Sequence, residues 1–320
     1  MRMNVVKTGP YGFGLVFHVV HMTDDVQALN EWYRDVFDAW MWWAYPELNY
    51  LEVEERIASM LIVGDLCIET MAPSDPLNLD APVARFYHRY GRHLHSVGYF
   101  VDDVDGFANR LHDEGISIAG PGGGDLERAK ELGYFYPRPR EAGGVMLQVT
   151  RPPGKRVHEG NSALDDPRLR DDWTSQTTRW DDHPLGVERL AYVTVGVRDI
   201  ATTKEIFERL WQAVPVHDAE DWEGARSSFV QLGHVLLRFA RPPDEAHALS
   251  AHIARYGDML YGLTFLVRYV DAADAHLRAK GIRTHRAAPG IVATDPDDCH
   301  GVPFSFTSTA VPGDPLSVAG

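Results

Sequence analysis

The hydrophobic residues of this chain recur in short segments that read in turn as strands and as amphipathic helices. Residues 17–37, FHVVHMTDDVQALNEWYRDVF, begin as a strand of about six residues and pass through an acidic turn that can cap a helix. In that helix the apolar residues recur at intervals of three and four: Val26, Leu29, Tyr33 and Phe37. Residues 64–70, GDLCIET, then read as a strand introduced by glycine. The pattern predicts a unit of one strand, one helix and about three further strands.

The same order of elements occurs four times, which indicates an internal duplication. Residues 89–101, RYGRHLHSVGYFV, align with residues 255–267, RYGDMLYGLTFLV, and Arg, Tyr, Gly, Leu and Val coincide. Residues 191–211, AYVTVGVRDIATTKEIFERLW, repeat the pattern of residues 17–37. The four predicted units span residues 14–72, 92–151, 187–241 and 258–308.

The units group into two predicted domains, residues 1–151 and 187–308. The segment 152–186 is rich in Pro, Asp and Arg and has few apolar residues, so we interpret it as a linker. We expect the tail, residues 309–320, to be disordered.

Charge and composition narrow the possible partners. The chain has 320 residues, enough for two medium domains, and a formal net charge of -15, which disfavours nucleic acids and anionic membranes. No apolar run approaches a membrane span, the first residues lack the apolar core of a signal peptide, and two cysteines make no disulfide framework. We therefore expect a cytoplasmic protein, monomeric or homodimeric, whose partner is a small molecule.

The four units, with FHVVHMTDDV at residues 17–26 and LHSVGYFVDDVDGFANRLHDEGI at residues 94–116, resemble the vicinal oxygen chelate superfamily. This superfamily contains glyoxalases, methylmalonyl-CoA epimerases, extradiol dioxygenases and bleomycin-resistance proteins. The resemblance covers about four-fifths of the chain. It implies an α+β fold in which four βαβββ modules pair into two eight-stranded, cup-shaped sheets. Because this fold serves many chemistries, it defines the architecture better than the function.

The resemblance also implies metal ligands early in the first strand and late in the last strand of each unit. In the first half these places hold His18, Glu69, Ser96 and Gln148. In the second half they hold Tyr192, Arg238, Gly262 and Ser305, which could not bind a divalent cation. We therefore expect the active site in the first half and a degenerate copy in the second.

The histidine that would complete the site depends on the register of one strand. Relatives usually have His where Ser96 stands. Strict alternation turns Ser96 into the cup and His95 away from it, whereas a bulge of one residue would bring His95 in. The predicted metal ligands are thus His18, Glu69, His95 and Gln148, a set that suits one Zn, Ni, Co, Mn or Fe ion. The alternatives are an ion pair between Glu69 and an arginine, and a hydrogen bond in which Gln148 locks the site.

Further residues are candidates for catalysis and substrate binding. Glu69 is the candidate general base, because a carboxylate late in a buried strand must be paired or functional. The aromatic run at residues 40–45 is either a substrate wall or core packing. The predicted substrate contacts are Ser96, Phe100, Trp42, Trp43 and Tyr136.

Three functions compete at this point. The first is a metal-dependent lyase or isomerase that acts on a small, fairly apolar compound with adjacent oxygens through a metal-stabilised, enolate-like intermediate. The second is a metal-free binding or resistance protein, or a metal-independent enzyme, which Ser96 in the place of His favours. The third is a ring-cleaving extradiol dioxygenase, against which the missing ligands of the second half count.

Overall fold

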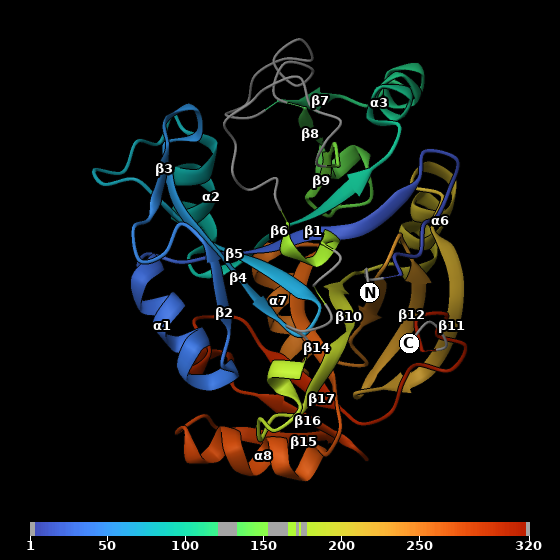
Figure 1. Ribbon diagram of the computed structural model, residues 1–320. Helices are drawn as coiled ribbons and strands as arrows, with labels where there is room; N and C mark the ends of the chain where they lie inside the picture. The colour runs from blue at the N-terminus through green and yellow to red at the C-terminus, as the bar shows by residue number, and fades with distance from the viewer. Residues whose placement is uncertain (1–3, 121–132, 153–165, 171–172, 174–177, 318–320) are drawn as a thin grey trace.

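The computed structural model describes residues 4–120, 133–152, 166–170, 173 and 178–317, and they form two mixed β-sheets with helices packed outside them (Figure 1). The first half contains β1 (Phe13–Met22), α1 (Val26–Phe37), β2 (Trp40–Trp43), β3 (Asn49–Leu51), β4 (Arg56–Val63), β5 (Leu66–Pro73), α2 (Pro82–Tyr90), β6 (His93–Val101), α3 (Val104–Asp113), β7 (Ile118–Ala119), β8 (Tyr134–Pro137) and β9 (Leu147–Thr150).

The second half repeats this order. It contains β10 (Val187–Gly196), α6 (Ile200–Leu210), β11 (Val214–Trp222), β12 (Ala225–Gln231), β13 (Leu236–Arg241), α7 (Ala248–Tyr256), β14 (Met259–Val267), α8 (Val270–Ala279), β15 (Thr284–Ala288), β16 (Ile291–Thr294) and β17 (Phe304–Thr307). Short 3-10 helices lie at Glu52–Glu54, Pro139–Glu141, Pro167–Leu169, Thr178–Trp180 and Pro296–Asp298.

The two sheets have equivalent strand orders. The first runs β2-β4-β5-β1-β6-β9-β8-β7, with β3 paired to β4, and the second runs β11-β12-β13-β10-β14-β17-β16-β15. In both, the first strand pairs in parallel with the last strand of its own module and antiparallel with the first strand of the next. The predicted α+β fold of four βαβββ modules in two cup-shaped sheets is confirmed, with one extra short strand at the edge of the first.

The acidic turns do cap the helices that follow them. Asp25 accepts a hydrogen bond from the backbone N–H of Ala28 at the start of α1. Asp199 accepts from the backbone N–H groups of Ala201 and Thr202 at the start of α6. These contacts satisfy N–H groups that have no partner inside the helix, and thereby fix where each helix leaves its strand.

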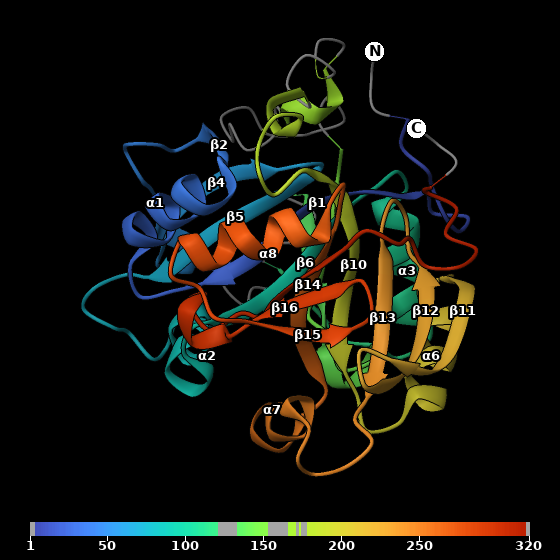
Figure 2. The same ribbon diagram turned by 90° about the horizontal axis from the view of Figure 1, so that it is seen from below.

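One hydrophobic core lies between the two halves and joins them. It contains Val19 and Tyr99 of the first sheet together with Val193 and Phe304 of the second. Helix α1 contributes Phe37, whose ring centre lies 5.4 Å from that of Phe304. Figures 1 and 2 show the two sheets side by side, with each cup directed away from this common core.

The segment expected to be a linker packs against both halves where it is described, and Asp181 forms an ion pair with Arg268 of the second half. The guanidinium of Arg168 is fully buried and donates hydrogen bonds to the backbone carbonyls of Val16 and Phe17, 2.9 and 2.7 Å away. The indole of Trp180 donates to the carbonyl of Phe37 at 2.8 Å. Residues 153–165, 171–172 and 174–177 of the expected linker lie outside the described residues.

The tail differs from the expected disorder as far as it is described. Val311 is buried in the second cup beside Tyr192 and Phe229, and Asp314 forms an ion pair with Arg189. Two buried apolar side chains, Val311 and Leu316, and one ion pair anchor this segment to the rest of the protein. Such sparse contacts leave no periodic pattern in the sequence. Residues 318–320 lie outside the described residues.

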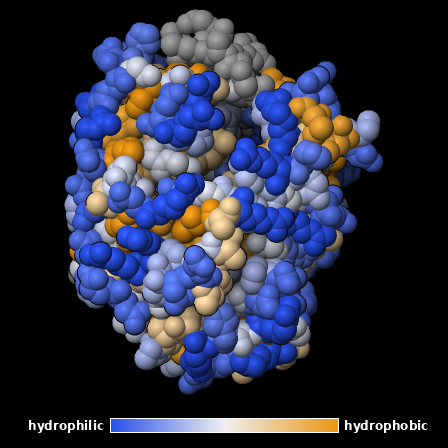
Figure 3. Space-filling view, turned by 180° about the vertical axis from the view of Figure 1, so that it is seen from behind, coloured by the Kyte–Doolittle hydropathy of each residue, from blue (hydrophilic) through white to orange (hydrophobic). Residues whose placement is uncertain are grey.

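The surface reflects the high charge of the chain. The face seen in Figure 3 is covered largely by hydrophilic side chains, and the hydrophobic ones form small separate patches. None of the helices in the described part of the chain combines the length and the apolar character needed to cross a membrane.

Candidate functional site

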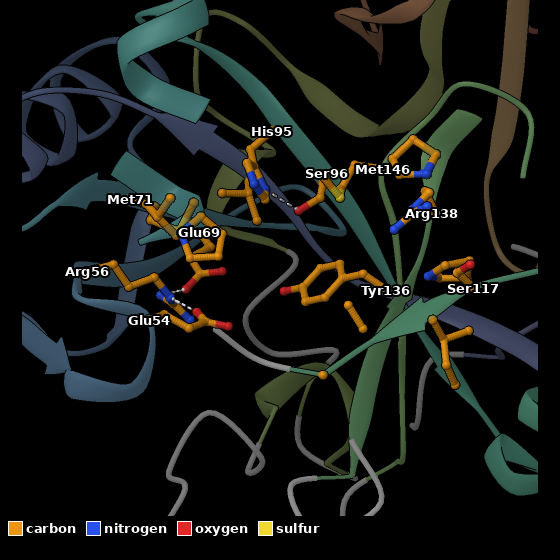
Figure 4. A pocket seen from close by; sticks show the side chains of 18 residues that line it. Glu54, Arg56, Glu69, Met71, His95, Ser96, Ser117, Tyr136, Arg138 and Met146 are labelled. Atoms are coloured by element: carbon orange, nitrogen blue, oxygen red, sulfur yellow. Dashed lines mark hydrogen bonds and ion pairs between the residues drawn. The ribbon is translucent and has the colours of Figure 1, made fainter. Parts of the chain in front are cut away.

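A cavity of about 250 Å³ lies in the first cup, between the sheet and the β7–β8 hairpin. Its apolar wall includes Val20, Met71, Val83, Ile118 and Met146. Its polar wall includes the side chains of Glu54, Arg56, Glu69, His95, Ser96 and Tyr136 (Figure 4). An enclosed, mostly apolar space with a few convergent polar groups is typical of a small-molecule site.

Glu69 is at the centre of the polar groups. It lies on β5 opposite Val20 of β1, is almost fully buried, and forms an ion pair with Arg56. Arg56 also forms an ion pair with Glu54, so one guanidinium joins two carboxylates. Burial alone would raise the pKa of Glu69, but the opposite charge of Arg56 and the nearby His18 outweigh it and leave this pKa below its usual value. Glu69 is therefore ionised at neutral pH.

His18 lies behind Glu69, between two of the predicted ligands. Its Nε2 is 2.9 Å from Oε1 of Gln148, and its Nδ1 is 3.2 Å from Oε2 of Glu69 without a hydrogen bond between them. Gly98 leaves room for this ring, because a Cβ atom there would come within 2.9 Å of it. Burial lowers the pKa of His18 against the attraction of Glu69, so the imidazole is neutral at neutral pH.

Gln148 connects His18 to the cavity. Its Oε1 faces His18 and also accepts a hydrogen bond of 3.0 Å from the hydroxyl of Tyr136, while its Nε2 donates to Oγ1 of Thr150 at 2.9 Å. Because Oε1 is an acceptor here, Nε2 of His18 is the protonated ring nitrogen, and Nδ1 carries a lone pair. Burial raises the pKa of Tyr136 well above its usual value, so this phenol remains a hydrogen-bond donor.

The strand that carries His95 and Ser96 contains a bulge. Val97 pairs with Val19 and Leu94 pairs with His21, so β6 has one more residue than β1 between these two pairs. As a result both His95 and Ser96 line the cavity, and Nδ1 of His95 lies 2.9 Å from Oγ of Ser96. The bulge is therefore present. It brings His95 into the cup beside Ser96, and Ser96 stays on the cup face as well.

Three predicted substrate contacts lie away from the cavity. Phe100 is buried against Phe17, with 4.8 Å between ring centres. Trp42 and Trp43 belong to the edge strand β2 and pack against the main hydrophobic core. Packing against the core, the alternative that the sequence left open, thus describes the tryptophans of the run, and a role of the run in substrate binding stays a prediction. Ser96 and Tyr136 do line the cavity.

Sequence reasoning missed Glu54 and Arg56, the groups that hold Glu69. Both come from the segment EVEERIASM, in which four charged side chains, those of Glu52, Glu54, Glu55 and Arg56, precede the apolar run of β4. Charged residues that alternate into a buried strand are a signal that could have been noticed. Their partner Glu69 is distant in sequence, however, and no local pattern reveals it.

The predicted ligands do not converge on a common point for a metal ion. Glu69 lies at Nδ1 of His18 and Gln148 lies at Nε2, whereas a metal ion binds one ring nitrogen. Arg56 places a positive charge directly on Glu69. Among the described residues, no three His, Cys, Asp or Glu side chains are grouped so that they could hold a metal. As placed, this donor set does not fit a divalent cation.

The corresponding place in the second cup is filled by a different network. Arg238 forms an ion pair with Glu223, and the hydroxyl of Tyr192 donates to Oε1 of Glu223 at 2.6 Å. The indole of Trp222 donates to the Tyr192 oxygen at 2.9 Å. These residues offer a divalent cation no set of free donors.

Comparisons with known proteins agree with this architecture. Residues 17–131 match the family described as the glyoxalase/bleomycin resistance protein/dioxygenase superfamily. A variant of 4-hydroxymandelate synthase from Streptomyces coelicolor is 14% identical, covers 95% of this chain and 97% of its own, and superposes with a TM-score of 0.60. No curated protein matches the sequence.

Methylmalonyl-CoA epimerases match over a smaller part of the chain. The enzyme from Mycobacterium tuberculosis is 21% identical over 39% of this chain and 91% of its own, with a TM-score of 0.36. A methylmalonyl-CoA epimerase in complex with methylmalonyl-CoA and NH4+ is 24% identical over 40% of this chain and 99% of its own, also with a TM-score of 0.36. The family match thus lies in the first half of this chain, and the chain as a whole has a tandem glyoxalase-like α+β fold.

Proposed function

We propose that this protein is a metal-independent enzyme that binds a small, largely apolar compound with adjacent oxygens in the first cup and transfers a proton on it. The observation that carries the proposal is the composition of the cavity wall. Apolar side chains such as Met71 and Met146 surround a polar end where Arg56, His95 and Tyr136 meet. The second cup has no equivalent set of free polar groups among its described residues.

His95 is the proposed proton acceptor. Its Nδ1 is engaged with Ser96, which leaves Nε2 directed to the cavity without a partner among the described residues. Burial, and to a lesser extent the charge of Arg56, lower the pKa of His95 to about 3, so the imidazole is unprotonated at neutral pH. Negative charge that develops on a substrate beside it would raise this pKa and favour the transfer.

Glu69 has a supporting role in this proposal. One carboxylate oxygen binds Arg56 and the other faces His18, so both oxygens are directed at protein groups and Glu69 is not the proposed base. Glu69 holds the guanidinium at the cavity wall, and His18 and Gln148 hold Glu69 and Tyr136 in turn. The candidate base of the sequence analysis thus becomes a positioning residue.

A metal-dependent lyase or isomerase is the second candidate, and one observation favours it. Nδ1 of His18 is buried without a hydrogen bond and faces a carboxylate oxygen of Glu69. Two such electron-rich atoms normally share a proton or a cation. The ring-cleaving dioxygenase has no comparable support, because Tyr192 and Arg238 stand where the second cup would need ligands.

Solvent deuterium exchange tests the proposal. Small uncharged hydroxy ketones that raise the melting temperature would be incubated with chelator-treated protein in D₂O and followed by proton NMR. We expect exchange at the carbon beside the carbonyl, slowed by about 10²–10⁴-fold in His95→Gln, the range of a general base. His112→Gln, on the exposed face of α3, is the matched control. Exchange that appears only after a divalent metal is added would overturn the proposal in favour of the metal-dependent candidate.

A further inference from the structure

We propose that the guanidinium of Arg56 takes the place of a metal ion in the first cup, and that the site consequently accepts an uncharged carbonyl compound in preference to a carboxylate. This inference rests on the proposed function, because it names the electrophile and the charge class of the ligand for the same cavity. It follows from three features of the site: the free donors of Arg56, the charge around them and the arrangement of the duplicated cup.

Arg56 keeps donors available to a ligand. Its Nε donates to Glu54 and its Nη1 to Glu69, while Nη2 donates to no acceptor in the part of the chain that the structure describes. The side chain is 12% exposed and lines the cavity. Figure 4 shows the phenol of Tyr136 directed toward the same group from the opposite wall. A carbonyl oxygen in this space can accept from the guanidinium, which would stabilise negative charge on that oxygen.

The charge balance restricts the ligand. Arg56 carries one positive charge and forms ion pairs with two carboxylates, those of Glu54 and Glu69. The group therefore has a net negative charge before any ligand binds. A carboxylate would add like charge in a poorly solvated cavity, whereas an uncharged carbonyl accepts the same hydrogen bond without that repulsion.

The second cup supports the idea that an arginine belongs at this place. Met60 pairs with Glu69 across β4 and β5, and Phe229 pairs with Arg238 across β12 and β13. In both cups an arginine–glutamate ion pair thus involves the residue of the strand beside β1 or β10: Glu69 pairs with Arg56 of β4, and Arg238 pairs with Glu223 from the turn before β12. In neither cup does the structure leave this position to a free carboxylate.

Cobalt titration tests the first part of the inference. Wild-type protein stripped with a chelator would be titrated with Co²⁺ and followed by visible absorption, beside Arg56→Ser, with circular dichroism to establish folding. We expect no Co²⁺ spectrum in the wild type, and either no spectrum or a weak one in Arg56→Ser. Stoichiometric binding of Co²⁺ to the wild type that is lost in His18→Ala would overturn the inference that Arg56 takes the place of a metal ion.

A matched set of probes tests the charge class. Benzamide, benzoate and benzylamine share one apolar ring and differ in charge, and their affinities would be measured by calorimetry. We expect benzamide to bind at least about tenfold more tightly than benzoate, a modest difference in free energy for one like-charge contact. Arg56→Met should remove most of the benzamide affinity, and Arg56→Lys should keep part of it. Arg226→Met, which breaks only an exposed ion pair with Glu220 in the second half, is the control and should change it little.

The outcomes separate this inference from the proposed function. If benzoate binds as tightly as benzamide, or if Arg56→Met leaves benzamide binding unchanged, the inference fails while a metal-independent cavity for small molecules stands. Met71→Trp fills the cavity. If none of the three probes binds to the wild type, and Met71→Trp leaves the rate of deuterium exchange unchanged, both proposals fail together.

Discussion

The two cups contain the same kind of ion pair at the same place, with the residues exchanged. In the first, Glu69 comes from the strand beside β1 and Arg56 reaches it from β4. In the second, Arg238 comes from the strand beside β10 and Glu223 reaches it from the turn before β12. A tyrosine hydroxyl donates to the outer glutamate in each case, from Tyr134 to Glu54 and from Tyr192 to Glu223.

The two pairs differ in how completely their donors are used. Arg238 donates to Glu223, to the carbonyl of Trp222 and to the hydroxyl of Ser227, and its side chain is only 3% exposed. A hollow at the mouth of the second cup is lined by Glu223 but not by Arg238. Arg56, in contrast, has unused donors at a cavity wall.

The comparison shows how a duplicated fold can separate stability from binding. A buried polar network in which every donor has an acceptor stabilises one arrangement of the cup. A network with donors left over at a cavity offers those donors to a ligand. The second cup has the satisfied network, and the first cup has the network with unused donors.

Removal of Arg238 should have the largest effect on the fold. Arg238→Met leaves Glu223 buried without its cation, so we expect the free energy of unfolding to fall by about 3–5 kcal/mol. Ligand affinity in the first cup should stay unchanged. Urea denaturation measures the loss, and Arg226→Met, which breaks an exposed pair with Glu220, serves as the control with a loss of about 1 kcal/mol or less. A small loss for Arg238→Met would mean that the second cup is not the more rigid one.

Acid should destabilise the protein through its buried histidines, of which His95 lies in the first cup. Burial holds the pKa of His95 at about 3, whereas an unfolded histidine has a pKa of about 6.5. The unfolded chain therefore binds more protons between these values, so stability is complete above pH 6.5 and decreases as the pH falls. At pH 5 the proton uptake of His95 on unfolding lowers the free energy of unfolding by about 2 kcal/mol.

His95→Phe should remove that part of the pH dependence. The test compares urea unfolding of both proteins at pH 7.5 and pH 5, and the difference between the two pH values should shrink in the variant. Other buried histidines, such as His21, act in the same direction, so some dependence will remain. An unchanged difference would show that His95 is not held neutral by burial.

The sequence was sufficient for the fold because the relevant signals are local and repeated four times. Strand alternation, acidic helix caps and glycines at strand starts each depend on neighbouring residues, and the repeat made them consistent. The positions of His18, Glu69 and Gln148 followed from the superfamily resemblance, and the structure does bring these three side chains together.

The remaining features depend on contacts that no local pattern contains. Alternation could not decide between His95 and Ser96, because a bulge changes the register without leaving a mark in composition. Arg56 could not be assigned to Glu69, since the two meet only when β4 and β5 pair. Trp42 and Trp43 looked like a substrate wall, because an aromatic run fits a cavity and a core equally well.

Truncation of Val311 should loosen the second cup alone. This side chain is buried with Tyr192, Phe229 and Leu236, so Val311→Ala removes two methyl groups from a packed cluster. We expect a loss of about 1–2 kcal/mol in the free energy of unfolding, measured by urea denaturation, with no change of ligand affinity in the first cup. If the affinity changed as well, the tail would couple the two cups and the comparison would have to be revised.

The smallest effect is expected for a tyrosine hydroxyl of the first cup, and its counterpart in the second cup provides the contrast. Tyr136→Phe removes one hydrogen bond to Gln148, whose Oε1 still faces His18, so the free energy of unfolding should fall by about 1 kcal/mol. Tyr192→Phe removes a donor from Oε1 of Glu223 and the acceptor of the Trp222 indole, two groups that are only partly exposed. Its loss should be about two to three times larger, because each unsatisfied group adds its own desolvation penalty. Ligand affinity should respond in the opposite order, since only Tyr136 lines the cavity of the first cup. Equal losses of stability for the two variants would contradict a second cup whose polar network is more completely satisfied than the first.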